Sequence, residues 1–314
     1  MSASNNSSSS ASTFTLIGIP GLEAANFWLA FLLCSLYLFA VLGNGTIIYI
    51  IKAEQSLHEP MYLFLCMLAA IDVLLSTSTM PRMMDLLWFN STTIGFDACL
   101  LQMFCIHSLS AMESTILLAM AFDRYVAICC PLRHAAILTS PRIAKIGLAA
   151  VIRGATMTAP FPIFIKRLPY CRSHIISHCY CEHMAVVKLA CADTRFNNIY
   201  GIIVAFFIVG LDLMFISLSY VKILRAVLSL ASKEEKLKAF STCVAHLWAI
   251  LVAYTPVVLS SIIYRFGHPV PPHVHILLAN FYLLFPPMMN PIVYGVKTKQ
   301  IRDRVLLLFR WKSF

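Results

Sequence analysis

Long runs of apolar residues alternate with short polar segments along the whole chain. Each run is long enough to cross a hydrocarbon layer of about 30 Å as an α-helix, which rises about 1.5 Å per residue. The pattern therefore predicts an all-α membrane protein built as a bundle of seven transmembrane helices. Because seven is odd, the two chain ends are expected on opposite sides of the membrane. The predicted spans are residues 27–51, 61–88, 99–128, 143–165, 198–226, 238–263 and 273–295.

The segments outside these spans divide the chain into three parts. Residues 1–26 begin with a serine-rich, uncharged stretch that is typical of a disordered tail. The seven-span domain covers residues 27–295, and its longest loop, at about 166–197, joins the fourth and fifth spans. Residues 296–314 are predicted to form a short amphipathic helix and a tail.

Composition agrees with a membrane location and disfavours an enzyme. Of the 314 residues, 60% are hydrophobic and 12% are charged, whereas soluble domains usually carry about 25% charged residues. The chain also lacks the nucleotide-binding motifs GxGxxG and GxxxxGK[ST] and the zinc-binding motif HExxH. We therefore expect no enzymatic activity and no resident metal.

The positive charges indicate the orientation of the chain. Most of the 24 Lys and Arg residues lie in segments on the side of the C-terminus, and residues 1–26 carry none. By the positive-inside rule, the C-terminus is cytoplasmic and the N-terminus is outside the cell, as in a multi-pass plasma-membrane protein. Because these cations are spread over several loops, they do not form a nucleic-acid-binding patch. On the outer side, Asn5 and Asn6 begin overlapping sequons and are the expected glycosylation site.

The predicted topology also sorts the 11 cysteines by compartment. Five fall on the outer, oxidising side, where disulfides are stable. A zinc site that includes a nearby histidine, such as His178 or His183, is the alternative, but the oxidising compartment favours disulfides. The odd number leaves one free thiol. These five are Cys99, Cys171, Cys179, Cys181 and Cys191.

Four ionisable side chains interrupt the apolar spans, namely Asp72, Glu113, Arg153 and Asp212. A charged residue at that depth costs about 2.5–3.5 kcal/mol on insertion scales, so a functional role is the first hypothesis. We expect Asp72 and Glu113 to meet across the second and third spans, where Na⁺ or a shared proton would offset their repulsion. For Asp212, a protonated or hydrogen-bonded interior carboxyl is an equally good interpretation.

Motifs in a fixed order make the chain similar to rhodopsin-like G protein-coupled receptors over essentially its whole length. The ends of the third and seventh spans carry the most characteristic of them. The matching residues are Asn44 in the first span, Asp72 in the second, Cys99 and Asp123-Arg124-Tyr125 at the two ends of the third, and Asn290, Pro291 and Tyr294 in the seventh.

Within that group the chain resembles an olfactory receptor. Five further motifs carry this resemblance, and they occur in the order found in that family. Additional phrases, such as "KLACADT" and the "RFGH" after the sixth span, resemble its class I, or fish-like, branch. The five motifs are "LHEPMYLFL" (57–65), "MAFDRYVAIC" (120–129), "SY" (219–220), "KAFSTCVAH" (238–246) and "PMMNPIVYG" (287–295).

The resemblance implies a signalling role for the residues at the cytoplasmic ends of the spans. Asp123 is expected to hold Arg124 in the resting state. On activation the sixth span would swing outward, and Arg124, Tyr220 and Tyr294 would help to form the site for a stimulatory, olfactory-type G protein that raises cAMP. A salt bridge that can open is one half of a two-state element.

The resemblance further implies how the outer cysteines pair. Cys99 is expected to bond to Cys181, and Cys171 to Cys191. Cys179 is then an additional thiol relative to the family pattern.

A small-molecule cavity is expected between the outer halves of the helices. On the third span, His107 and Ser110 are one turn apart, and on the sixth, Ser260, Ser261 and Arg265 approach the outer mouth. Class I receptors, by resemblance, recognise polar odorants such as short carboxylic acids, and an arginine fork suits a carboxylate. We therefore predict an acid ligand, with Arg265 as the anchor and His107 as a second donor.

Two positions depart from the general receptor pattern. Ile106 stands where amine receptors carry an aspartate, so no anion is expected there for an ammonium group. Tyr254 stands where other receptors carry tryptophan, and we expect it to be the ligand-responsive switch.

Three other functions are compatible with the sequence. One is a rhodopsin-like receptor for another small metabolite. A second is an ion-coupled transporter that uses the intramembrane carboxyl groups, but the halves of the chain show no repeat of the kind transporters usually have. A third is an adhesion or structural protein, for which the outer loops are too short to form a large interface.

Overall fold

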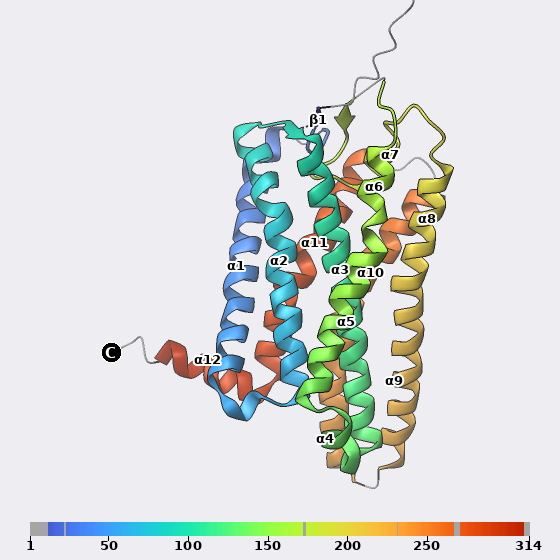
Figure 1. Cartoon of the computed structure of the whole chain (residues 1–314). Helices are drawn as coiled ribbons and strands as arrows, with labels where there is room; N and C mark the ends of the chain where they lie inside the picture. The colour runs from blue at the N-terminus through green and yellow to red at the C-terminus, as the bar shows by residue number, and fades with distance from the viewer. Residues whose placement is uncertain (1–11, 22, 172–173, 231, 267–270, 311–314) are drawn as a thin grey trace, which may run out of the picture.

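The computed structural model describes residues 12–21, 23–171, 174–230, 232–266 and 271–310. Within this part of the chain, seven helices are long and apolar enough to cross a membrane, and they pack side by side as a bundle (Figure 1). A small β-sheet lies at one end of the bundle, which we call the sheet end. A short helix, α12 (Lys299–Arg310), lies across the opposite end, which we call the α12 end (Figure 1).

The long helices follow the seven predicted apolar runs and extend slightly beyond them. Two of the runs are made of more than one element, because the fourth helix is interrupted by a proline and the fifth contains a π turn. The elements are α1 (Asn26–Ala53), α2 (Pro60–Phe89), α3 (Phe96–Cys129), α5 (Ser140–Thr158) with α6 (Pro160–Lys166), α8 (Arg195–Ala205) with η4 (Phe206–Gly210) and α9 (Leu211–Ser229), α10 (Lys233–Phe266) and α11 (Pro272–Lys297).

Local sequence explains where several of these helices begin and end. Pro60, Pro160 and Pro272 stand at first helical positions, where the missing N–H of proline costs nothing and its fixed φ suits a helix. Helix α2 ends at Phe89 and is followed by Asn90, whose φ of 52° is in the left-handed region that favours glycine or asparagine after a helix.

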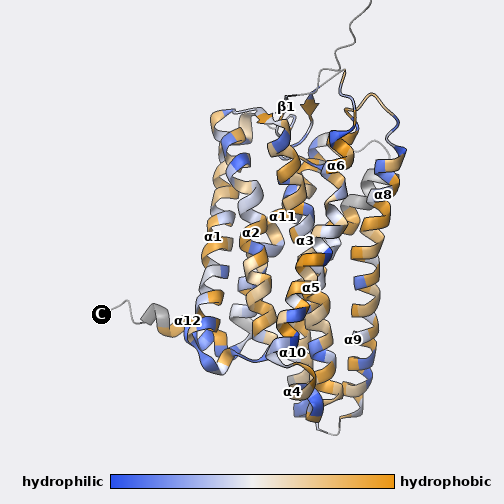
Figure 2. Cartoon of the chain, in the orientation of Figure 1, coloured by the Kyte–Doolittle hydropathy of each residue, from blue (hydrophilic) through white to orange (hydrophobic). Residues whose placement is uncertain are grey.

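The outward faces of the helices are apolar. Large side chains such as Trp28, Leu42 and Phe206 are more than half exposed in the isolated chain. In Figure 2 hydrophobic residues dominate the middle of the helices, and hydrophilic residues gather toward the two ends of the bundle. A surface of this kind fits a lipid environment, because so much exposed apolar area is unfavourable in water.

Two glycines allow neighbouring helices to approach closely. A Cβ added at Gly43 would lie 2.9 Å from the Pro291 ring, between α1 and α11. At Gly154 it would lie 2.8 Å from the Ser108 carbonyl oxygen, between α5 and α3. Small residues at such crossings are typical of helix packing in membranes.

The sheet end is closed by three short strands, β1 (Thr13–Leu16), β2 (Thr93–Gly95) and β3 (Ile175–Ile176). Strand β1 lies in the middle, antiparallel to β2 and parallel to β3. Two of its side chains, Phe14 and Leu16, are fully buried. The segment 1–26 is therefore not a tail throughout: alternation of polar and apolar residues in Thr13–Leu16 gives a strand with one buried face. The expected glycosylation site, Asn5 and Asn6, lies outside the described residues.

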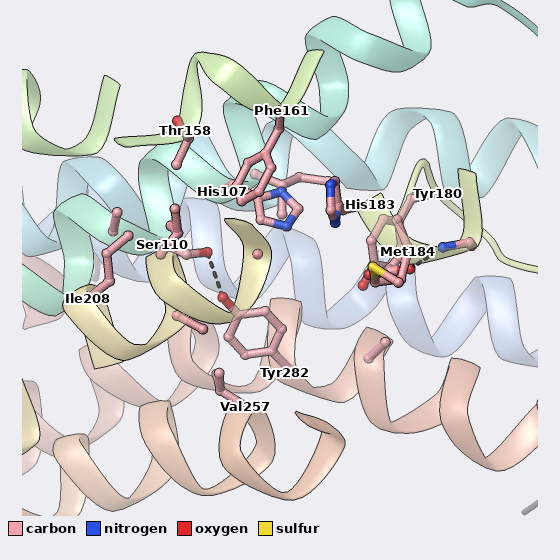
Figure 3. Close-up of a pocket in the computed structure, with 18 of the residues that line it drawn as sticks. His107, Ser110, Thr158, Phe161, Tyr180, His183, Met184, Ile208, Val257 and Tyr282 are labelled. Carbon is pink, nitrogen blue, oxygen red and sulfur yellow. Dashed lines mark hydrogen bonds between the residues drawn. The ribbon is translucent and has the colours of Figure 1, made fainter. Parts of the chain in front are cut away.

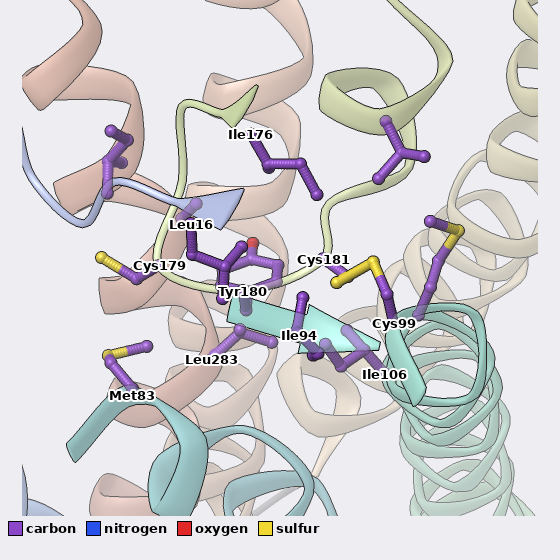
Figure 4. Close-up of a cluster of buried hydrophobic side chains, with 14 of the residues drawn as sticks. Leu16, Met83, Ile94, Cys99, Ile106, Ile176, Cys179, Tyr180, Cys181 and Leu283 are labelled. Atoms are coloured by element: carbon purple, nitrogen blue, oxygen red, sulfur yellow. A yellow bond between two sulfur atoms is a disulfide. The ribbon is translucent and has the colours of Figure 1, made fainter. Parts of the chain in front are cut away.

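Below the sheet, an apolar cluster joins the strands to the helix bundle. Leu16, Ile94 and Ile176, one from each strand, pack over Leu283 of α11 and the Cys99–Cys181 disulfide (Figure 4). The loop that carries β3 continues into a short helix, α7 (His183–Val187). The cluster thus fixes this loop against the bundle.

Both expected disulfides are present, Cys99–Cys181 and Cys171–Cys191. Cys179 is a free and buried thiol, and Asn280 of α11 donates a hydrogen bond to its sulfur at 3.6 Å. Burial raises the pKa of the Cys179 thiol to about 12. Since the thiolate is the reactive form, this additional cysteine is an inert packing residue at physiological pH.

At the opposite end, α12 is held to the bundle by side chains on its inner face. Ile301 is fully buried, and Arg304 pairs with Glu54, just after α1, at 2.8 Å. Tyr62 of α2 donates a hydrogen bond to Gln300. These contacts agree with the amphipathic helix predicted from the sequence.

Candidate ligand-binding site

A cavity of about 580 Å³ lies in the sheet-end half of the bundle. Helices α3, α10 and α11, the segment from α8 to η4, and the loop from β3 to α7 surround it. Three of the predicted ligand residues, His107, Ser110 and Tyr254, line it. The other three, Ser260, Ser261 and Arg265, fall in the last turns of α10, outside the residues whose side chains are described. Apolar side chains form much of the wall, including Ile106, Val204, Ile208, Val257 and Ile276.

Three rings meet at the end of the cavity nearest the sheet. The His107 ring centroid lies 5.2 Å from that of Phe161 and 6.2 Å from that of His183, and the Phe161 and His183 centroids are 4.4 Å apart (Figure 3). His107 donates from Nδ1 to the Met103 carbonyl oxygen at 2.8 Å. Its Nε2 is therefore an acceptor in the neutral ring, and it donates to a ligand only when the ring takes up a proton.

His183 is the more available donor of the two histidines. Its Nε2 is buried and has no hydrogen-bond partner among the described residues, and the side chain lines the cavity. Burial and the neighbouring His107 lower the pKa of His183 to about 3. The ring is therefore neutral at physiological pH and can carry its single proton on Nε2, ready for an acceptor on a ligand.

The part of the cavity farther from the sheet, which we call its floor, is polar. Tyr282 of α11 donates a hydrogen bond to Ser110 of α3 at 2.6 Å (Figure 3). One turn further along α3, Ser114 donates to Asp212 at 2.5 Å and accepts from the Tyr254 hydroxyl at 2.6 Å. Tyr254, the expected switch residue, therefore lies at the floor of the cavity. Its hydroxyl is hydrogen-bonded to Ser114 of α3 and, through Ser114, is connected to Asp212 of α9.

An ion pair extends this network across the bundle. Arg153 of α5 contacts the same Asp212 carboxylate oxygen at 2.8 Å. The guanidinium also donates to Thr115 of α3 at 2.8 Å and to the Phe207 carbonyl oxygen in η4 at 2.6 Å. Asp212 is buried, so this partner explains how a carboxylate is accommodated at that depth. Of the two interpretations of Asp212 from the sequence, a hydrogen-bonded interior group fits the structure.

Asp72 and Glu113 lie close enough to interact electrostatically. Both are buried, and each has one carboxyl oxygen without a hydrogen-bond partner among the described residues. The second oxygen of Asp72 accepts a hydrogen bond from Asn290 of α11 at 2.8 Å. Two carboxyl groups with unused oxygens fit either a monovalent cation or a proton.

At the α12 end, the arrangement of the Asp123-Arg124-Tyr125 motif differs from the expected one. Among the described residues, the basic partner of Asp123 is His134, at 2.9 Å, rather than Arg124. His134 begins the short helix α4 (His134–Ile137), which follows the turn η3 (Pro131–Arg133). This turn brings the imidazole back to α3, where it reaches Asp123.

Arg124 instead interacts electrostatically with two tyrosines from other helices. Its charge acts on the hydroxyls of Tyr220 in α9 and Tyr294 in α11. Tyr220 also forms a 2.7 Å hydrogen bond with His246 of α10. The structure therefore brings together the three residues that the resemblance assigns to one site, and it adds His246.

The remaining predicted residues, Tyr125, Asn44 and Pro291, lie beside the Arg124 group or along α11. Lys222 lies 5.4 Å from the Tyr125 ring centroid. Pro291 packs where Gly43 leaves room between α1 and α11, and Asn44 of α1 donates to the Pro287 carbonyl oxygen at 2.8 Å. The two contacts with α1 hold α11, the helix that carries Asn290 and Tyr294, in place.

The sequence alone does not identify several residues that the structure places at these sites. In the sequence, His183 stands out only as a neighbour of cysteines, and no motif used above points to Tyr282 or His246 as a site residue. The position of His246 inside the motif at 238–246 was the available signal for it. For Tyr282, the polar Ser110 on α3 was the nearest hint, because a buried hydroxyl needs a partner.

Comparisons with known proteins agree with this architecture. The family model described as "Olfactory receptor" matches residues 33–312. Olfactory receptor 51E1 of Homo sapiens is 63% identical over 97% of this chain and 96% of its own length. Olfactory receptor 52K1 of Homo sapiens is 59% identical over the full length of both chains, and Olfactory receptor 51E2 of Rattus norvegicus is 57% identical over 95% of this chain and 93% of its own. The fold matches squid rhodopsin with a TM-score of 0.70 and 18% identity, covering 94% of this chain and 87% of rhodopsin.

Proposed function

Because the chain belongs to the olfactory receptor family of G protein-coupled receptors, in its class I-type branch, we propose that it detects a small carboxylic acid odorant. Membership also makes it a multi-pass plasma-membrane protein and not an enzyme. In the proposed function, acid binding activates a stimulatory G protein of the olfactory type and raises cAMP, with the N-terminus and the sheet end outside the cell.

The cavity carries the argument for an acid. Its sheet end offers His183, whose Nε2 is free to donate, and His107, which donates once protonated. A bound carboxylate favours that proton, because opposite charges attract strongly in a site shielded from water. Arg265 belongs to the last turn of α10, on the same side of the bundle, and its planar fork suits a carboxylate. The apolar wall fits an alkyl chain.

We expect Arg265→Ala to weaken the response to acids by about 30-fold or more. Truncating one partner of a desolvated charge pair costs about 2–5 kcal/mol, and about 1.4 kcal/mol corresponds to one decade in affinity. Arg265→Lys should restore only part of the potency, because an ammonium lacks the bidentate fork. The measurement is a cAMP dose–response curve for a series of linear acids, normalised to surface expression.

The methyl ester of the most potent acid is the matched control for that experiment. It keeps the shape of the acid and removes its charge, so it should be a poor agonist of the wild-type receptor. An ester as potent as the acid, or an unchanged acid response in Arg265→Ala, would contradict the carboxylate assignment.

The proposed coupling to a G protein is supported by the α12 end. There, Arg124, Tyr220, His246 and Tyr294 come from four different helices, so relative movement of these helices changes their contacts. The ligand cavity lies in the other half of the bundle. The ligand therefore acts through helix movement, favouring the arrangement of helices that it binds more tightly.

We further propose that Asp72 and Glu113 share a Na⁺ ion in the resting receptor. A ligand at 100 times its dissociation constant stabilises the state that it binds by about 2.7 kcal/mol. NaCl should therefore raise the melting temperature of the purified receptor above that in N-methylglucamine chloride at equal ionic strength. Asp72→Asn and Glu113→Gln should each remove the difference. Equal melting temperatures in the two salts, with a dependence on pH alone, would indicate a shared proton instead.

A further inference from the structure

The cavity is larger than a short acid requires, and its floor holds an unused carboxyl group. Glu113 is 5% exposed and lines the cavity, and its Oε1 has no hydrogen-bond partner among the described residues. Drug-sized ligand sites begin at about 300 Å³, and this cavity measures about 580 Å³. A short alkyl acid held at the sheet end would leave the floor unoccupied.

The residues near Glu113 are those that form the floor of the cavity. Glu113 interacts electrostatically with the hydroxyls of Tyr254 on α10 and Tyr282 on α11, both of which also line the cavity. These two hydroxyls are already hydrogen-bonded to Ser114 and Ser110. Glu113 therefore differs from these two hydroxyls in having an oxygen that makes no hydrogen bond to any other described residue.

The distance from the sheet end to this oxygen sets the length of the ligand. His107 and Glu113 are six positions apart on α3, which corresponds to a rise of about 9 Å along the helix axis. With carbon–carbon bonds of about 1.5 Å in a zigzag chain, about seven bonds span that rise. A straight-chain acid of that length brings its far end to Glu113.

We infer that the preferred ligand is bifunctional, an ω-hydroxy carboxylic acid of about seven carbons. Its carboxylate lies at the His107–His183 end. In the activated receptor, which no longer holds the Na⁺ proposed for the resting state, its terminal hydroxyl donates a hydrogen bond to Glu113. This inference rests on the proposed acid-sensing function and specifies the ligand class of that cavity. A terminal methyl group in the same place leaves a buried carboxyl oxygen without a partner, which is unfavourable.

The direct test compares 7-hydroxyheptanoic acid with octanoic acid, which differs in having a methyl group in place of the hydroxyl. In cAMP dose–response curves on the wild-type receptor, the hydroxy acid should be more potent by about tenfold or more, as for a hydrogen bond to a carboxyl group. The shorter pair, 5-hydroxypentanoic acid and hexanoic acid, should show no such preference, because its hydroxyl cannot reach Glu113. This comparison of chain lengths is made on the wild-type receptor alone.

Substitutions at the floor identify the group that makes the contact. Glu113→Met removes the acceptor at similar volume and should reverse the preference toward octanoic acid, whereas Glu113→Gln keeps a carbonyl oxygen and should retain part of it. Leu117→Met is the matched control, because Leu117 lines the same cavity from α3 and its side chain has no polar atom. It should leave the preference for the hydroxy acid unchanged.

Two different failures are distinguishable. Potent responses to linear acids, with no advantage of the hydroxyl at any length or with an unchanged advantage in Glu113→Met, would overturn this inference and leave the acid receptor intact. A receptor that reaches the cell surface and responds to none of the acids would overturn the proposed function and this inference with it.

Discussion

Arg153→Ala is expected to prevent the receptor from reaching the cell surface. The substitution leaves Asp212 buried without its cationic partner, and removing one member of a buried pair typically costs about 3–5 kcal/mol. That is a large fraction of the 5–15 kcal/mol by which folded proteins are usually stable. The three other groups that Arg153 and Asp212 bind, Thr115, Ser114 and the Phe207 carbonyl oxygen, also lose a partner or their alignment.

The effect can be assigned to the unpaired charge with two further variants. Arg195→Ala removes an arginine whose side chain is 89% exposed and whose partner Asp193 is 4.0 Å away, so surface expression should not change. The double substitution Arg153→Met with Asp212→Leu replaces both charges by apolar groups and should recover much of the surface expression that Arg153→Ala loses. The measurements are flow cytometry of an N-terminal epitope and the melting temperature of solubilised receptor. Normal expression of Arg153→Ala would contradict the structural role of the pair.

Arg124→Ala is expected to abolish the cAMP response while leaving surface expression intact. Arg124 is not engaged by Asp123, which is paired with His134, so its removal leaves no buried carboxylate without a partner. Its charge acts instead on the hydroxyls of Tyr220 and Tyr294, at the end of the bundle that faces the cytoplasm in the proposed orientation. Loss of this cation removes the group expected to receive the G protein.

The control for this prediction is Arg302→Ala on α12. Its side chain is 48% exposed at the same end of the bundle and lies 3.7 Å from Asp303, so the variant should signal normally. Both variants are compared by agonist-stimulated cAMP at matched surface expression. An Arg124→Ala receptor that is expressed and signals as well as Arg302→Ala would show that the switch assignment is wrong.

The helices could be predicted from sequence because their cause is local. Each apolar run is long enough to satisfy all its backbone hydrogen bonds as a helix in lipid. Proline positions such as Pro160 account for the one visible interruption in the fourth span. The disulfides followed from the family resemblance, since five outer cysteines by themselves allow several pairings.

The strand β1 and the polar network could not be predicted in this way, because their causes lie far away in the sequence. Thr13–Leu16 becomes a strand only because residues 93–95 and 175–176 are beside it. Arg153 and Asp212 are 59 positions apart and neither position alone indicates the other. Asp123 illustrates the same limit at shorter range, since its pairing with His134 depends on how the turn η3 folds back.

The central place of β1 in the sheet has a consequence for biogenesis. Among the described elements this strand is synthesised before all the others, yet its parallel partner β3 follows only after four of the seven long helices. The sheet therefore closes late, and its closure couples the strand nearest the N-terminus to the loop that covers the cavity. An epitope or signal sequence fused to the N-terminus is best tolerated when it ends before residue 12, because an attachment inside Thr13–Leu16 would remove the strand on which that closure depends.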